Sequence, residues 1–224
     1  MFRYIGYGTA TAATVGLLVV AGVLGTTRPA PAAELTEALD NVNKAKSYRH
    51  VLKMTFGGQT MFEMTTYKQG ERMRFEAGKD IAIVVDDKGN VVQFDSVNKT
   101  ATKLDVLAMR KNQPKPPAES AGLMKKIADL KGEGVERIGE ETLDGKKTTV
   151  YTFKDVALGG ATTDWKVWVD PKRKFPVRME QLKKGDKDTE TIITSEYSGW
   201  DEEFDAKLFS LDVPDGYKLT EAKK

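Results

Sequence analysis

Residues Trp165–Gln181 read WKVWVDPKRKFPVRMEQ and carry the clearest strand pattern in the chain. Over Trp165–Asp170, apolar side chains at every second position alternate with a second set that includes Lys166 and Asp170. The same alternation recurs over Val177–Gln181, and a period of two is typical of β-strands. Between the two runs, Asp170-Pro171 predicts a turn, because proline fixes its own φ and keeps the preceding residue out of the helical region. The basic tip Lys172-Arg173-Lys174 has no apolar pattern and is expected to be solvated. We therefore predict an antiparallel hairpin here.

Comparable patterns recur along the chain and predict a mainly β protein with some helix. About six short strands are expected between Tyr48 and Leu104, separated by turns such as Gly57-Gly58 and Asp87-Lys88-Gly89-Asn90. Strands resume at Val135 and end in a long strand over Thr189–Trp200. The total expected is about eleven strands.

Two segments have a helical period instead. Leu35–Ser47 places its apolar residues on one face and predicts an amphipathic N-terminal helix. The second segment, residues 105–131, begins with Asp105 as a helix cap and continues through the stiff spacer Pro114–Pro117. Leu123, Ile127 and Leu130 then repeat at helical spacing. This segment is predicted to be a helical insert between two β halves.

The composition excludes several kinds of site. The chain has no cysteine, which rules out disulfides, thiolate metal sites and thiol nucleophiles, and its single histidine, His50, leaves no multi-histidine metal site. Arg3 and Arg28 precede the first acidic residue, Glu34, so the remaining 33 basic residues balance the 33 acidic ones. No basic surface for nucleic acid is expected from that balance. We expect no metal and no cofactor.

The first 32 residues have the features of a signal peptide. Arg3 precedes a charge-free run over Tyr4–Thr27 with an apolar centre at Val15–Leu24, and Ala30-Pro31-Ala32 offers a cleavage site. The alternative is an uncleaved anchor to the inner membrane through residues 4–27, because about 20 apolar residues can span a bilayer. Either way the protein is expected to be exported, to the periplasm or beyond, with residues 33–224 forming one domain.

Few residues suggest catalysis. His50 falls on the inward side of its strand, where a lone histidine is expected to be a satisfied polar residue rather than a base or ligand. Asp201-Glu202-Glu203 lacks the alternating ligands and glycine of a calcium loop, and Asp86-Asp87 is expected to cap its own turn. No serine lies in a nucleophile elbow, and nothing in the pattern supports a carboxylate-pair glycosidase. We therefore expect that the protein is not an enzyme.

The order of helix, strand meander, helical insert and second β half resembles the LolA-like family of periplasmic carriers and sensors, which hold acyl chains. The segment IAIVVDDKGNVVQFDSVNKTATKL (Ile81–Leu104) is similar to that family's strand–turn–strand unit. The closing FDAKLFSLDVPDGYKL (Phe204–Leu219) is similar to its C-terminal signature. The resemblance implies an open, strongly curved antiparallel sheet, an unclosed half-barrel, covered by the N-terminal helix and a helical lid.

One turn departs from the family pattern. Carriers of the family often have an arginine in a turn after the second strand, which hydrogen-bonds the lid helices and controls their opening. The matching stretch here is Lys68-Gln69-Gly70, so Gln69 stands where that arginine would be. This departure leaves open whether the lid is controlled as in the carriers and whether the cargo is a lipoprotein.

The resemblance implies a monomeric protein whose ligand is a lipid acyl chain or a lipoprotein, with an envelope sensor domain that binds a protein partner as the alternative. Methionines are concentrated on the first strands and the insert, where they are either core filler or an adaptable surface for acyl chains. The residues predicted to line an apolar cavity are Leu52, Met54, Phe62, Met64, Met73, Phe75, Phe94, Leu107, Leu123, Met124 and Ile127.

Overall fold

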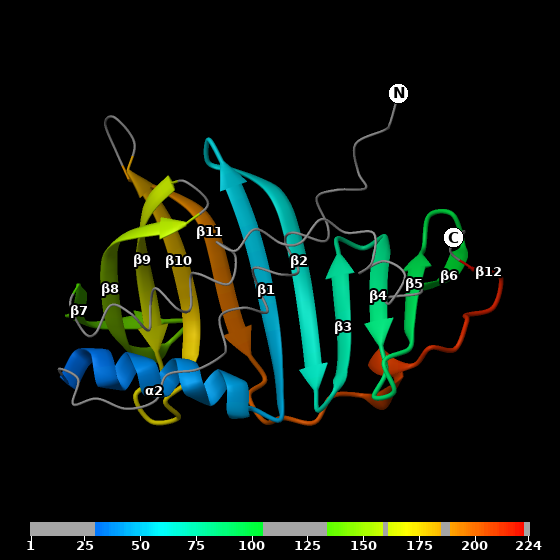
Figure 1. The fold of residues 1–224 in the computed structure, drawn as a ribbon, viewed down its shortest axis with the longest axis horizontal. Coiled ribbons are helices and arrows are strands. Elements are labelled where there is room, and N and C mark those ends of the chain that lie inside the picture. The colour runs from blue at the N-terminus through cyan, green and yellow to red at the C-terminus, as the bar shows by residue number, and fades with distance from the viewer. Residues whose placement is uncertain (1–29, 105–133, 159–160, 185–188, 222–224) are drawn as a thin grey trace. The chain divides into compact units, whose positions relative to one another are not determined.

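The computed structural model describes residues 30–104, 134–158, 161–184 and 189–221. These residues form one α-helix, a short 3-10 helix and twelve strands, so the protein is mainly β as predicted (Figure 1). The bounds are α2 Ala30–Lys44, β1 Ser47–Phe56, β2 Gln59–Gln69, β3 Arg72–Ala77, β4 Ile81–Val85, β5 Val91–Asp95, β6 Thr100–Leu104, β7 Val135–Leu143, β8 Lys146–Leu158, β9 Ala161–Val169, β10 Pro176–Lys184, β11 Thr189–Ser198, η2 Ala206–Phe209 and β12 Lys218–Glu221.

The strands hydrogen-bond in the order β12-β6-β5-β4-β3-β2-β1-β11-β10-β9-β8-β7. This order has two free ends and does not return on itself, which confirms the prediction of an open, unclosed sheet. The chain divides into two compact units, one made of residues 1–44 with 116–195 and the other of residues 45–115 with 196–224. Residues 1–29 of the predicted leader, which was expected over residues 1–32, and the predicted helical insert over residues 105–131 lie outside the described residues.

Helix α2 confirms the predicted N-terminal helix but with different ends. It begins five residues earlier than expected, where Pro31 suits a first helical turn because proline's fixed φ is already helical. It ends three residues earlier because Ser47 joins β1 and pairs with Gln69 of β2. The apolar stripe Leu35, Ala38, Leu39 and Val42 is buried. The helix lies against β7 and β10 of its own unit.

The hairpin predicted from Trp165–Gln181 is confirmed as β9 and β10. Trp165 pairs with Gln181 and Val167 with Met179, so these four side chains share one buried face. The carboxylate of Asp170 accepts hydrogen bonds from the amides of Lys172 and Arg173 at 2.8 and 3.0 Å, which closes the turn. The basic tip is exposed as expected, and Lys174 also pairs with Glu37 of α2 through Nζ at 2.8 Å.

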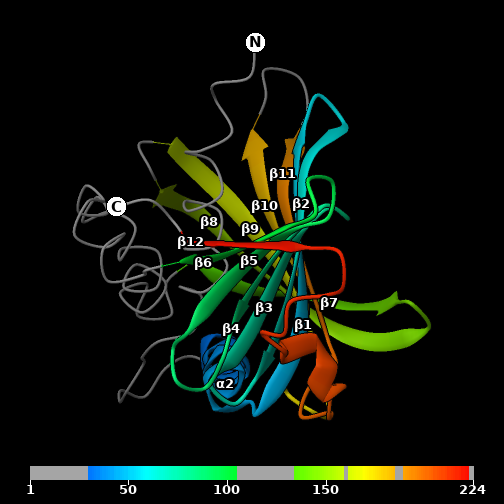
Figure 2. The same cartoon turned by 90° about the vertical axis from the view of Figure 1, so that its right-hand side faces the viewer.

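The other unit contains the meander β1–β6, and its short last strand was not predicted. The strand β12 runs parallel to β6, with Lys218 opposite Thr100 and Glu221 opposite Lys103 (Figure 2). A parallel pairing between distant segments has no hairpin turn, so the sequence gives no local signal for it. The last long strand, β11, also ends two residues before the predicted Trp200, since Gly199 takes a left-handed φ of 63° and turns the chain.

The register of the meander divides its side chains between two faces. One face of β2–β4 is covered by residues that follow β11. On that face Gln69 Oε1 accepts from the amide of Phe204 at 3.1 Å, and Arg72 lies over the ring of Phe209 at 5.1 Å. The guanidinium of Arg74 also contacts the carbonyl of Leu208. We call this the covered face, and the opposite side of β1–β4 the apolar face.

Candidate functional site

The apolar face consists of side chains that stand opposite one another on four adjacent strands. Directly paired residues of antiparallel strands point to the same side of a sheet. One row runs from Leu52 through Met64 and Ala77 to Ile81. The adjacent rows contribute further apolar residues, so that β1–β4 present Leu52, Met54, Phe62, Met64, Met73, Phe75, Ala77, Ile81, Ile83 and Val85 on one side.

Exposure on this face increases away from the centre of β1. Leu52 and Met64 are buried, whereas Met73, Phe75 and Ile83 are partly exposed. Met54, near the end of β1, is 38% exposed. The covered face contrasts with this, because Val84 and Val92 on it are buried. The apolar face therefore has partly exposed apolar side chains next to one another on β3 and β4, while the covered face combines these buried valines with the partly exposed Ala82 and Phe94.

Six of the eleven predicted cavity residues come together on the apolar face, and they are Leu52, Met54, Phe62, Met64, Met73 and Phe75. Phe94 does not join them, because it pairs with Ala82 and Ala101 on the covered face. The sequence pattern could not separate the two sides here, since β4 is apolar on both and β5 begins with two valines. Leu107, Leu123, Met124 and Ile127 lie outside the described residues.

An aromatic cluster, formed by Tyr48, His50, Tyr197 and Trp200, lies beside β1 at the buried end of the apolar face. His50 pairs with Thr66, and its neighbours Tyr48 and Leu52 on alternate positions of β1 share its side of the strand. The imidazole of His50 stacks on Tyr197 with ring centroids 4.5 Å apart, and Tyr197 stacks on Trp200 at 5.4 Å. Tyr197 and Trp200 were not among the predicted site residues, because they are far from β1 in the sequence.

His50 is deeply buried, and one of its ring nitrogens lacks a hydrogen bond to the described part of the chain. Only 2% of it is exposed, and its Nε2 atom has no hydrogen-bond partner among the described residues. Burial lowers the pKa of His50 to about 4, so the ring is neutral at pH 7. The expectation of a satisfied polar residue is therefore wrong for Nε2. A neutral imidazole in this environment can still donate or accept one hydrogen bond.

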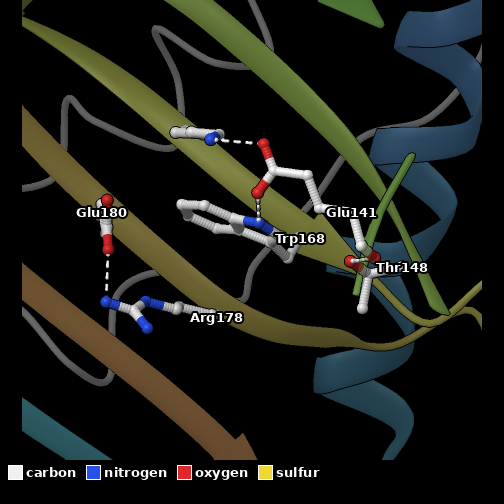
Figure 3. Close-up of polar contacts among 6 residues, drawn as sticks. Glu141, Thr148, Trp168, Arg178 and Glu180 are labelled. Carbon is white, nitrogen blue, oxygen red and sulfur yellow. Dashed lines mark hydrogen bonds and ion pairs between the residues drawn. The ribbon is translucent and has the colours of Figure 1, made fainter. Parts of the chain in front are cut away.

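A second polar cluster belongs to the other unit and holds four of its strands together (Figure 3). The indole of Trp168 is 4% exposed and donates to Glu141 Oε2 at 2.8 Å, while Lys166 Nζ contacts Glu141 Oε1 at 2.7 Å. Arg178 lies over the same indole and pairs with Glu180. Hydrogen bonds from Lys166 and then Trp168 hold the pKa of Glu141 below its usual range. A carboxylate kept ionised by fixed donors is suited to structure rather than to proton transfer.

Two cavities lined by described residues contain none of the residues of the apolar face. One, of about 220 Å³, lies on the covered face among Arg74, Ala82, Phe94, Pro214 and Tyr217. The other, of about 170 Å³, belongs to the unit that contains α2. There the hydroxyl of Tyr151 donates to Glu34, and burial followed by this carboxylate raises the pKa of Tyr151.

The acidic candidates have structural partners. Asp86 accepts from the amides of Lys88 and Asn90 at 2.9 and 2.8 Å, as expected for a turn that caps itself. Asp201 accepts from the amide of Lys46 at 2.7 Å. Within the described ranges, no three His, Cys, Asp or Glu side chains are grouped so that they could hold a metal ion.

Comparison with known proteins gives structural neighbours but no sequence relatives. Neither a protein-family model nor a curated protein matches the chain. The lipoprotein LppX of Mycobacterium tuberculosis superposes with a TM-score of 0.55 and 16% identity, over 79% of this chain and 98% of that one. LprF of Mycobacterium bovis superposes with a TM-score of 0.51 and 11% identity, over 87% of this chain and all (100%) of that one. At these identities the likeness concerns the fold alone, and it confirms the LolA-like fold expected from the sequence.

Of the helices in the part of the chain that the structure describes, none is both long enough and apolar enough to cross a membrane.

Proposed function

We propose that this protein is an exported, non-enzymatic carrier that binds the acyl chain of a lipid or lipoprotein on the apolar face of β1–β4. The observation that supports this is the contrast between the two sides of one meander. The covered face is occupied by residues after β11, whereas Phe75, Ile83 and Val85 keep part of their apolar surface available on the other side.

The chemistry of this face suits a hydrocarbon chain. Removing apolar surface from water is favourable by about 25 cal/mol per Å², or about 0.8 kcal/mol for each methylene group buried. The unbranched side chains of Met64 and Met73 can adapt to ligands of irregular shape. A partly open apolar face therefore gains free energy from an acyl chain without any charged group in the site. Export, the signal peptide and the monomeric state are parts of the same proposal.

A comparison of two phenylalanines on opposite faces tests the proposal. Phe75→Asp places a carboxylate on the apolar face, and Phe94→Asp places one on the covered face near Arg74. Uptake of a fluorescent fatty-acid probe should weaken at least about tenfold in Phe75→Asp, because burying an unpaired charge costs several kcal/mol. Phe94→Asp is the matched control and should bind the probe like the parent protein. Equal binding by both variants, with both folded by circular dichroism, would contradict the proposal.

One observation favours a second function, that of an envelope sensor domain. The side chain of Gln69 accepts a hydrogen bond from the amide of Phe204, whereas the arginine that carriers often have at this position hydrogen-bonds lid helices. A sensor would use the same fold to bind a protein partner rather than to pass a lipid on. Native mass spectrometry of protein taken from its own envelope separates the two, since a carrier retains a lipid mass and a sensor a protein mass.

A further inference from the structure

Two buried polar atoms lie at the inner end of the apolar face. They are Nε2 of His50 and the hydroxyl of Tyr197, and neither has a hydrogen-bond partner among the described residues. The two residues are 2% and 6% exposed, and their rings are stacked. Buried polar atoms are nearly always hydrogen-bonded, because leaving one unsatisfied destabilises the folded state. Two such atoms in one stacked pair therefore indicate that a third group completes the site.

The pair lies in line with the apolar residues of the proposed site. His50 stands opposite Thr66, Thr66 opposite Phe75, and Phe75 opposite Ile83, so these residues form one row across β1–β4. Adjacent strands are about 4.8 Å apart, which puts the Cα of Phe75 about 10 Å from that of His50. A chain lying along this row would bring one end next to the imidazole.

The charge state of the pair selects the kind of group that fits. Burial lowers the pKa of His50 to about 4 and raises that of Tyr197, so both side chains are uncharged at pH 7. Their other ring contacts are aromatic, with Tyr48 6.2 Å and Trp200 5.4 Å from Tyr197. An ionised carboxylate or phosphate would lose its hydration at this pair, and the Lys68 ammonium lies over the ring of Tyr48, 5.6 Å from its centroid, rather than over His50 or Tyr197. An ester carbonyl or a hydroxyl needs only hydrogen bonds, which a neutral imidazole and a phenol supply.

We propose, on the basis of the function proposed above, that His50 and Tyr197 anchor the bound lipid by hydrogen-bonding an uncharged oxygen of its ester or hydroxyl group. The ligand class is then a neutral acyl ester, such as a glyceride, with its hydrocarbon on the apolar face and its ester oxygen at this pair. A free ionised fatty acid and a plain hydrocarbon are both poorer ligands.

The experiment compares three probes, monoolein, oleate at pH 8 and hexadecane, each delivered from cyclodextrin to the purified chain. The parent protein should bind monoolein most tightly. Tyr197→Phe and His50→Phe should each weaken monoolein binding by about three- to tenfold and leave hexadecane binding unchanged, because each removes one hydrogen bond. Tyr67→Phe on the covered face is the matched control and should alter neither affinity. Equal affinities for monoolein and hexadecane in the parent protein would overturn the anchor.

The single histidine provides a second readout that does not depend on a variant folding. Because His50 is the only histidine of the chain, its imidazole nitrogens give one set of ¹⁵N resonances. The Nε2 resonance should shift when monoolein is added and should not shift with hexadecane. An unchanged resonance with bound monoolein would mean that the pair binds a water molecule only, and the anchor proposal would be wrong. Failure of all three probes to bind would instead contradict the carrier function itself.

Discussion

The imidazole of His50 lies parallel to the phenol ring of Tyr197, with the ring planes 17° apart. Tyr197 is in turn stacked on Trp200, so the imidazole forms the end of an aromatic stack. Water is therefore kept away from a titratable group that lies beside an otherwise apolar face. The immediate consequence is that His50 should make the stability of the fold depend on pH.

Stability should fall in acid partly because of His50. Its pKa is about 4 in the folded protein and about 6.5 when unfolded, so the unfolded state binds more protons between these values. The contribution of His50 is fully present above pH 6.5 and is lost as the pH falls to 4, and the total is about 3 kcal/mol. Urea unfolding of the parent protein at several pH values should show this decrease.

His50→Phe supplies the control, because carboxylates also titrate in this range. Between pH 7 and pH 4, the unfolding free energy of the parent should fall by about 3 kcal/mol more than that of the variant. A difference that stays constant with pH would show that His50 is not buried as a neutral group.

The Trp168 cluster is expected to stabilise the unit that contains it. Trp168→Phe removes the hydrogen bond to Glu141 and weakens the stacking of Lys166 and Arg178, and should lower the unfolding free energy by about 1–2 kcal/mol. The matched control is Glu140→Gln, which breaks an exposed ion pair with Lys147 and should leave the melting temperature nearly unchanged. Thermal melts of both variants check this, and a larger loss in Glu140→Gln would refute it.

Cleavage after Ala32 is expected in the exported protein and would leave Ala33 as the first residue. Helix α2 begins at Ala30, so cleavage removes three residues of its first turn and leaves the apolar stripe that starts at Leu35. The contact between Glu34 and Tyr151 is also retained. The intact mass of protein purified from the envelope should correspond to residues 33–224. A mass for residues 1–224 would instead support the anchored form.

Local sequence patterns predicted most of the secondary structure, but they could not predict which distant segments of the chain contact one another. Alternation over Trp165–Gln181 was sufficient for a hairpin, because each strand has two chemically different sides. Ile81–Val85 is apolar at every position, so only its register shows that Ile83 and Val85 share a side with Phe75. The same limitation put Phe94 on the wrong face. Tyr197 was missed because its contact with His50 joins segments that are distant in the chain.

The last prediction tests whether the apolar face has free volume. Ala77 and Ala82 are both partly exposed alanines, on β3 and β4, but Ala77 belongs to the apolar face and Ala82 to the covered face. Ala77→Trp should place an indole where an acyl chain would lie. Displacing only two methylenes would weaken binding by about 1.6 kcal/mol, or about 15-fold. Uptake of the fluorescent fatty-acid probe should fall accordingly.

Melting temperature is the second half of that test, since a filled core and an open face respond differently to a larger side chain. Overpacking a closed core costs about 1–3 kcal/mol, whereas an open face accepts the indole at little cost. Ala77→Trp should therefore melt close to the parent protein while binding less probe, and Ala82→Trp should keep the probe affinity. A large drop in the melting temperature of Ala77→Trp, together with no probe uptake by the parent protein, would mean that β1–β4 form a closed core and carry no lipid.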